Sequence, residues 1–394
     1  MKKISRRFFL SALPSGILGF GMTKSINSNF KPLRQSSEDE QSLKIKKYNP
    51  FGKTGLKVSD VSCGAISLFE PNVLRYAYDL GVNYFDTAES YLRTKSETFM
   101  GQALKDVRQK VIITTKHAFP SQGEIKRENI IQRMETSLKR MQTDYVDIAM
   151  VHSVDNLSML ENEEILAAYS QLKKDGKVRF TGFSTHNAKV TLKQALSNDF
   201  AQIILLIYNH FEGPEIEPLL KEVHEKGIGT IAMKVFAGGK QGNLKSLINA
   251  EHSYPQAAIR WVISNPNIDC CIVTMSSYSH VEEYIGASGK PLNRDDLKLI
   301  AAYRRQASNQ YCRVSCKECL IACPNNVAIN DVLRYGMYFE DYRMEKEAIL
   351  YYAQLEDTKK PLSCSSCSGP CVRACPYGLD VKGKLIHTHE LLSV

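Results

Sequence analysis

Four polar residues in the first half of the chain are of the types that move a proton to or from a carbonyl oxygen: Asp86, Tyr91, Lys116 and His152. A tyrosine with its ordinary pKa of about 10 is a weak acid near neutral pH, and a neighbouring ammonium group makes it a readier proton donor. Lys116 suits that role, with Asp86 holding the ammonium group and His152 positioning the oxygen that receives the proton. The alternative is a buried network that serves only stability, although buried charges are costly stabilisers.

Eight of the eleven cysteines lie after residue 310, in two runs of four. The first run has the spacing C-x₃-C-x₂-C-x₃-C-P and the second has C-x₂-C-x₃-C-x₃-C-P. Bacterial ferredoxins use C-x₂-C-x₂-C-x₃-C-P, in which the fourth cysteine of each run binds the other iron–sulfur cluster. Both runs keep the closing C-x₃-C-P and carry one extra residue, so they resemble a ferredoxin module with two [4Fe–4S] clusters.

The ferredoxin resemblance implies two crossed sets of thiolate ligands. One cluster would be held by Cys312, Cys316, Cys319 and Cys375, and the other by Cys364, Cys367, Cys371 and Cys323. Two alternatives stay open, because four-thiolate zinc sites use similar cysteine pairs and an exported chain with an even number of such cysteines could form disulfides. The other three cysteines, Cys63, Cys270 and Cys271, lie in apolar stretches and are expected in the core.

The elements that must position the four polar residues alternate between apolar and amphipathic segments. Short apolar, β-branched runs predict eight strands, at residues 58–65, 83–87, 111–116, 146–152, 178–184, 203–208, 229–234 and 270–275. Continuous apolar strands joined by helical segments are typical of a parallel sheet covered by helices. Eight such units predict a closed (β/α)₈ TIM barrel, because the open doubly wound fold would lead with a G-x-G-x-x-G motif. Residues 51–56 are predicted to form a hairpin that plugs the N-terminal end of the barrel.

Active sites of such barrels lie at the carboxyl ends of the strands. Asp86, Lys116 and His152 end the second, third and fourth predicted strands, and Tyr91 follows five residues after Asp86. The segment F-D-T-A-E-S-Y, the order of the four residues, and the later segment A-A-I-R-W-V-I-S-N-P resemble the aldo-keto reductase family. The resemblance covers residues 47–290 and implies an NAD(P)-dependent oxidoreductase that interconverts a carbonyl and an alcohol by hydride transfer, with Tyr91 as the proton donor.

The family resemblance also implies cofactor-binding positions on the same rim. They are Ser184, Tyr208, Lys234, Ser276, Ser277 and His280. Three positions depart from the usual pattern, since Thr185 replaces an asparagine, Leu205 a glutamine, and Met233-Lys234 a Tyr-Ser pair. His280 stands where NADP-preferring members often have arginine, so the cofactor is expected to be NADP or NAD. These departures favour an alternative hypothesis, a non-catalytic electron carrier or binding protein that uses the barrel as a docking scaffold.

The segments outside the barrel predict an exported protein. Residues 1–30 contain Arg6-Arg7 before a modestly apolar run and resemble a twin-arginine export signal, with a general secretory signal as the alternative. Residues 31–46 are predicted to be a linker, 291–308 a connecting helix, and 309–394 the ferredoxin-type domain. We therefore expect a periplasmic protein, or one held at the membrane by an uncleaved signal.

Composition narrows the expected partners. The net charge of +9 is spread along the chain without a long basic run, so nucleic acid is not an expected ligand. No run of about 18 or more apolar residues occurs, so no membrane-spanning helix is expected in the mature body. The expected partners are a small carbonyl or alcohol substrate and a redox protein that exchanges electrons with the clusters. Clusters with a purely structural role are the alternative.

Overall fold

The computed structural model describes residues 43–119, 125–238, 253–313, 316–342 and 344–393. The predicted export signal and most of the predicted linker lie outside these residues. Residues 43–46 are described, and there Ile45 is buried and its backbone N–H donates to the carbonyl oxygen of Leu80 at 2.9 Å. The end of the predicted linker is therefore packed on the folded part of the chain. Among the described residues, no helix is long and apolar enough to cross a membrane.

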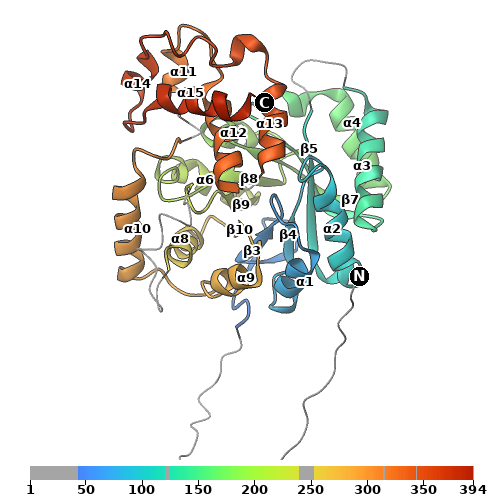
Figure 1. Ribbon diagram of the computed structural model, residues 1–394. Helices are drawn as coiled ribbons and strands as arrows, with labels where there is room; N and C mark the ends of the chain where they lie inside the picture. The colour runs from blue at the N-terminus through green and yellow to red at the C-terminus, as the bar shows by residue number, and fades with distance from the viewer. Residues whose placement is uncertain (1–42, 120–124, 239–252, 314–315, 343, 394) are drawn as a thin grey trace, which may run out of the picture. The chain divides into compact units, whose positions relative to one another are not determined.

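Eight parallel strands close into a barrel, which confirms the predicted architecture (Figure 1). In chain order they are β3 (Val61–Gly64), β4 (Tyr84–Asp86), β5 (Ile112–His117), β6 (Val146–Val151), β7 (Val178–Thr185), β8 (Ile203–Ile207), β9 (Gly229–Met233) and β10 (Cys270–Thr274). Each strand pairs with its neighbour in the chain, and β10 pairs with β3 to close the ring. The chain order of the strands is thus also their order around the barrel.

A hairpin plugs the N-terminal end of the barrel. Strand β1 (Tyr48–Pro50) pairs antiparallel with β2 (Lys57–Ser59). Phe51, at the start of the hairpin loop, is fully buried in the barrel interior, with its ring edge-on to Tyr84 at 5.7 Å between centroids. The first predicted strand, 58–65, is therefore two elements, because β2 belongs to the hairpin and only β3 belongs to the barrel.

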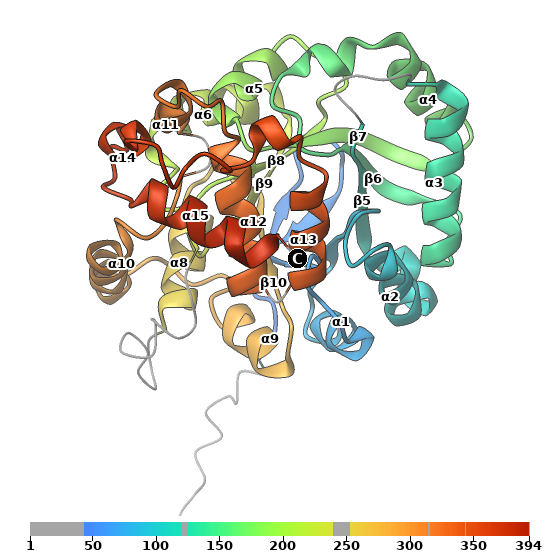
Figure 2. The same ribbon diagram turned by 45° about the horizontal axis from the view of Figure 1, so that its top comes forward.

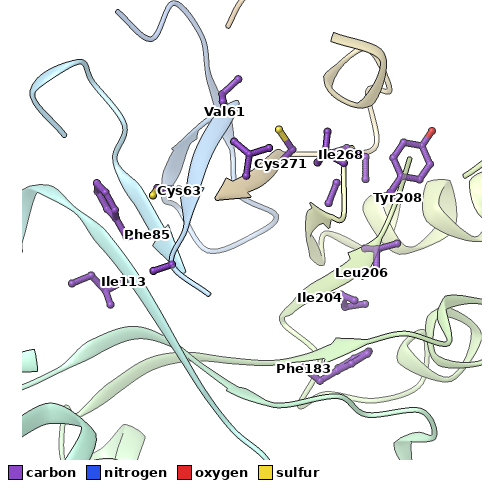
Figure 3. Packing of buried hydrophobic residues seen from close by; sticks show 14 of the residues in the cluster. Val61, Cys63, Phe85, Ile113, Phe183, Ile204, Leu206, Tyr208, Ile268 and Cys271 are labelled. Carbon is purple, nitrogen blue, oxygen red and sulfur yellow. The ribbon is translucent and has the colours of Figure 1, made fainter. Parts of the chain in front are cut away.

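Helices cover the outside of the barrel. They are α1 (Pro71–Asp79), α2 (Lys95–Leu104), α3 (Arg127–Met141), α4 (Glu163–Lys174), α5 (Ala188–Ala195), α6 (Glu217–Lys226), α8 (Tyr254–Ile263) and α9 (Tyr278–Ile285). Alternate strand residues such as Phe85, Ile113 and Phe183 belong to the large core cluster between strands and helices (Figure 3). Because the strands are buried on both faces, most of their residues are apolar, which is why the sequence pattern identified them.

The chain after the barrel is helical. Helix α10 (Arg294–Ala307) matches the predicted connection and is tied to α8 by a buried ion pair between Arg260 and Asp296. It is followed by α11 (Glu318–Ile321), α12 (Ile329–Tyr342), α13 (Glu345–Ala353), α14 (Pro370–Ala374) and α15 (Val381–Leu392). These helices share a second apolar cluster that includes Val332, Ala348 and Leu385. In Figure 2, α12 and α13 lie in front of the barrel strands.

Candidate active site

A cavity of about 1260 Å³ lies at the carboxyl ends of the strands. Three of the four predicted catalytic residues, Asp86, Tyr91 and His152, line it. The cavity is also lined by five of the six predicted cofactor-binding residues: Ser184, Lys234, Ser276, Ser277 and His280. Residues from five different strand ends therefore meet in one space, as the barrel geometry requires.

Lys116 and Asp86 form a buried ion pair beneath this cavity. The Lys116 ammonium group donates to Asp86 Oδ1 at 2.5 Å and to the backbone oxygen of Thr87 at 2.6 Å. Both side chains are at most 1% exposed. Burial raises the pKa of Asp86 and lowers that of Lys116, and the attraction between the two opposes both shifts. The contact fixes the ammonium group in one place.

Tyr91 lies directly beside this pair. The Lys116 nitrogen is 4.8 Å from the centre of the Tyr91 ring, and the ring is edge-on to His152 at 5.7 Å between centroids. Burial raises the pKa of Tyr91 well above its ordinary value, and the charge of Asp86 raises it further. The expected promotion of the phenolate by Lys116 is thus outweighed before any substrate is bound. Tyr91 is held protonated, which is the form that donates.

His152 is partly buried and neutral. Burial, followed by the charges of Lys116 and Arg334, lowers the pKa of His152 to about 3. A neutral imidazole offers one N–H donor and one acceptor, so it can donate to a carbonyl oxygen beside the Tyr91 hydroxyl. Asp86, Tyr91, Lys116 and His152 are thus brought together, as the sequence predicted.

Strained backbone flanks several of these residues. Leu92, Arg93 and Thr94, which follow Tyr91, have φ of 50°, 52° and 73°. Ser153, next to His152, has φ of 58°, and Lys234 has φ of 56°. Left-handed conformations at residues other than glycine cost on the order of 1–3 kcal/mol each and cluster at functional sites. The strain supports the assignment of this end of the barrel as the site.

The predicted cofactor-binding serines surround a helix N-terminus. Ser277 caps α9 by accepting a hydrogen bond from the His280 backbone N–H at 3.2 Å, and Ser276 Oγ contacts His280 Nδ1 at 3.0 Å. Ser184, at the end of β7, accepts from the Ser153 backbone N–H at 2.8 Å. Backbone N–H groups at a helix start attract phosphate. These residues fit a dinucleotide phosphate on one wall of the cavity.

Tyr208 does not belong to the site, so that prediction is wrong on this geometry. Its hydroxyl lies between Glu217 and Asn265, at 3.0 and 2.7 Å, and its ring stacks on Trp261. The reason is the alternation of a strand, in which residues two apart share a face. Ile204, Leu206 and Tyr208 belong to the cluster between barrel and helices (Figure 3), whereas Leu205 lines the cavity.

Comparison with known proteins agrees with this geometry. The sequence profile of the Aldo/keto reductase family matches residues 69–249. L-galactose dehydrogenase of Arabidopsis thaliana is 31% identical over 276 residues, which are 60% of this chain and 86% of that protein. The chain belongs to the aldo/keto reductase family. It therefore belongs to a family of oxidoreductases, and the profile match ends before the cysteine runs.

Two further relatives extend the comparison. A protein of Schizosaccharomyces pombe named "Putative voltage-gated potassium channel subunit beta" is 38% identical over 156 residues, 35% of this chain. The chain spans 45% of the length of that relative. An aldo-keto reductase structure from Bacillus halodurans superposes with a TM-score of 0.54 at 22% identity, over 65% of this chain and 95% of that one. This last likeness shows that the barrel fold is shared.

Residues of the C-terminal helices complete the cavity of this aldo/keto reductase, and the sequence did not predict them. Arg334, Tyr338 and Tyr342 of α12 line it, together with Tyr351 of α13. The spacing of the first three, four residues apart, puts them on one helix face. That polar aromatic stripe is the signal in the sequence that could have indicated them.

The cysteines lie as free thiols within the described residues. Cys312, Cys316, Cys319 and Cys375 line one small cavity. Burial raises the pKa of Cys364 to about 11, and Cys323, Cys371 and Cys367 lie close enough to raise it further. Each of these two groups of cysteines therefore combines three cysteines of one run with the last cysteine of the other run. In the described part of the chain, no three His, Cys, Asp or Glu side chains are grouped so that they could hold a single metal ion.

Proposed function

We propose that this aldo/keto reductase interconverts a carbonyl and an alcohol by hydride transfer, with Tyr91 as the proton donor. The observation that carries the proposal is the convergence of Tyr91, His152 and the Lys116–Asp86 pair at the floor of the cavity. The relative named L-galactose dehydrogenase supports a reaction of this class.

Each residue of the set has a distinct task in the reduction. Neutral His152 donates a hydrogen bond to the carbonyl oxygen and orients it toward Tyr91. Tyr91 then gives its proton to that oxygen, which leaves a phenolate in a buried site. The Lys116 ammonium group, 4.8 Å from the ring centre, stabilises this charge, and Asp86 keeps the ammonium group protonated and fixed. In the oxidative direction the phenolate takes the proton back.

A nicotinamide cofactor fits the remaining wall of the cavity. Ser276, Ser277 and His280 at the start of α9 would hold a phosphate, and Ser184 would hold the carboxamide; all four line the cavity. NADPH or NADH, when bound there, supplies the hydride. Both cofactors stay open, because His280 does not itself select for a 2′-phosphate.

The test of the proposed chemistry is the turnover of the Tyr91→Phe variant with a panel of aldehydes and ketones. Loss of turnover with unchanged cofactor binding supports the proton-donor role, and unchanged turnover rules it out. Tyr48→Phe is the matched control, because Tyr48 is 42% exposed and its hydroxyl contacts only the backbone oxygen of Gly81 among the described residues.

We also propose that the C-terminal domain holds two [4Fe–4S] clusters. The support is the crossed grouping of the cysteines, in which Cys375 lies with the first run and Cys323 with the second. A four-iron cube takes one thiolate at each iron, so its ligands surround the cube and do not converge on one point. The described cysteines are not grouped closely enough to hold a single metal ion, which is compatible with ligands that surround a cluster.

Anaerobic purification tests the cluster assignment. A broad absorption band near roughly 400 nm that dithionite bleaches is expected for thiolate-bound iron–sulfur clusters. A colourless protein with bound zinc would contradict the assignment. If NADPH alone also bleaches the band, the clusters exchange electrons with the barrel and then with a redox partner. If it does not, they are structural or serve the alternative function, electron carriage without carbonyl chemistry.

Export by the twin-arginine pathway remains part of the proposal. The expectation rests on Arg6-Arg7 and the apolar run after them. Replacement of both arginines by lysine should leave the protein in the cytoplasmic fraction, whereas the unaltered chain should appear in the periplasm or at the membrane. Equal distribution of the two would contradict it.

A further inference from the structure

Lys234 is an unusual side chain for the wall of an active site. It follows β9 in a left-handed conformation, and its ammonium nitrogen is buried without a hydrogen-bond partner among the described residues. The charges of Glu212 and Cys312 act on it, but neither group forms a hydrogen bond with the ammonium nitrogen. A buried charge without a partner is costly, so a fold that retains one at a cavity wall is suited to an incoming anion.

A second cation reaches the same cavity from the C-terminal domain. Arg334 of α12 lines the cavity, and its side chain is only 17% exposed. One guanidinium nitrogen donates to Asp331 at 2.6 Å, which anchors the group from behind. His152, His186 and Lys234 line the same cavity as Arg334, and the charge of Arg334 lowers the pKa of all three. Lys234 and Arg334 are thus two cations near the residue that positions the carbonyl oxygen.

The acidic side chains that line the cavity have other contacts. Asp86 is held by Lys116, and Glu340 contacts His387 at 3.0 Å near the protein surface. Asp341 also lines the cavity, and its charge acts on Tyr303 and Tyr342. The carboxylate whose charge acts on Lys234 is that of Glu212, which does not line the cavity. The space between Lys234 and Arg334 therefore favours a negatively charged group.

We propose that the substrate of this aldo/keto reductase is an anionic carbonyl compound, whose carboxylate binds between Lys234 and Arg334 while its carbonyl oxygen lies at Tyr91 and His152. The proposal rests on the reaction proposed above and adds the substrate class. A guanidinium group binds a carboxylate through two parallel hydrogen bonds, and an ammonium group adds a point charge. In the proposed function the cofactor phosphates would be held at Ser276, Ser277 and the start of α9, so Lys234, expected from the sequence to bind the cofactor, is assigned with Arg334 to the substrate.

The proposal gives the C-terminal helices a role in the reaction. Arg334 is supplied by a domain that follows the barrel in sequence, and α12 and α13 lie over the barrel end in Figure 2. Specificity in barrels of this kind comes from segments over the mouth. Here the anion-binding residue is on a helix whose next residues, Tyr335 and Tyr338, also line the cavity.

An aldehyde that carries a carboxylate and its methyl ester, which lacks the charge and has one more methyl group, test the proposal on the full-length holoenzyme. Reduction of 4-carboxybenzaldehyde is compared with that of methyl 4-formylbenzoate, for the unaltered chain and for Lys234→Met and Arg334→Met. Because a charge-assisted hydrogen bond contributes about tenfold to a hundredfold in affinity, we expect kcat/KM to favour the acid by at least about tenfold. Either substitution should remove that preference through a higher KM for the acid.

Two further measurements separate the sources of a failure. The affinity for NADPH alone should be unchanged in both variants, and a loss there instead would assign the cations to the cofactor phosphate and overturn the proposal. Calorimetric titration with benzoate, which needs no turnover, should show binding to the unaltered chain and to Tyr91→Phe, weakened at least about tenfold by Lys234→Met. If neither aldehyde reacts but benzoate binds in this way, the carbonyl chemistry fails and the anion site stands.

Folding is controlled within the same experiment. Lys234→Met removes a buried charge without a partner, so its unfolding temperature should be equal to or above that of the unaltered chain. Lys298→Met is the matched control, because Lys298 is 77% exposed and pairs only with Asp295 among the described contacts. Equal preference of the unaltered enzyme for acid and ester, or absence of benzoate binding, would overturn the proposal.

Discussion

Replacement of Lys116 by methionine separates its chemical role from its structural one. The substitution removes a cation 4.8 Å from the centre of the Tyr91 ring and leaves the Asp86 carboxylate buried without its partner. Two unit charges about 5 Å apart interact by roughly 3 kcal/mol at an effective dielectric constant of about 20. Since about 1.4 kcal/mol is a factor of ten in rate, the loss of phenolate stabilisation should lower kcat about a hundredfold or more.

The same substitution should also destabilise the fold. Removal of one partner of a buried ion pair costs about 3–5 kcal/mol, because the other charge stays buried. A second substitution, Asp86→Asn, removes that charge, so the double variant Lys116→Met/Asp86→Asn should recover most of the free energy of unfolding. It should not recover turnover, because the phenolate still lacks a cation.

Urea unfolding and steady-state kinetics on the single and double variants provide the assay. The reasoning would be refuted if turnover returned together with stability, since Lys116 would then act only in the structure. It would be refuted equally by a Lys116→Met variant that is folded and retains turnover within about threefold. Unaltered cofactor affinity in all variants confirms that the cavity is intact.

Three more predictions concern other parts of the molecule. Tyr208→Phe should lower the free energy of unfolding by about 1–2 kcal/mol, measured in urea, because two side-chain hydrogen bonds are lost, and should leave kcat and cofactor affinity unchanged. His210 has a pKa lowered to about 3 by burial, so its protonation on unfolding destabilises the protein as pH falls below about 6.5. Acid titrations of stability should therefore be shallower below that pH in His210→Gln. Cys375→Ser should remove the cluster of the first run and leave that of the second, and Cys323→Ser the reverse, each lowering iron from about eight to about four atoms per chain. Loss of the cluster in the same run as the altered cysteine would contradict the crossed assignment.

The barrel and the floor of its site were predictable because both depend on local patterns. Buried parallel strands are continuously apolar, and a barrel brings the carboxyl ends of all its strands to one rim. The placement of Asp86, Lys116 and His152 at three successive strand ends was therefore sufficient to bring them together. The crossed cysteine pairing was likewise expressed in the spacing, and it stays a prediction until metal is measured.

What the sequence did not predict depends on the phase of a strand or on contacts between distant segments. Tyr208 was assigned to the cavity, but it shares the outward phase of Ile204 and Leu206, so its side chain faces the helices. Arg334 lies a hundred residues after Lys234 in sequence, and no local pattern states that α12 packs over the barrel. The splitting of the first strand depends on the antiparallel pairing of the hairpin, which apolar runs do not reveal.

The central claim is that Tyr91 delivers the proton to a carbonyl oxygen in this cavity. Single-turnover reduction of 4-carboxybenzaldehyde by protein loaded with NADPH tests it most directly, with the unaltered chain compared with Tyr91→Phe. The account predicts that the rate of NADPH oxidation falls at least about a hundredfold in the variant while NADPH binds with unchanged affinity. A variant that oxidises NADPH within about threefold of the unaltered rate would contradict it.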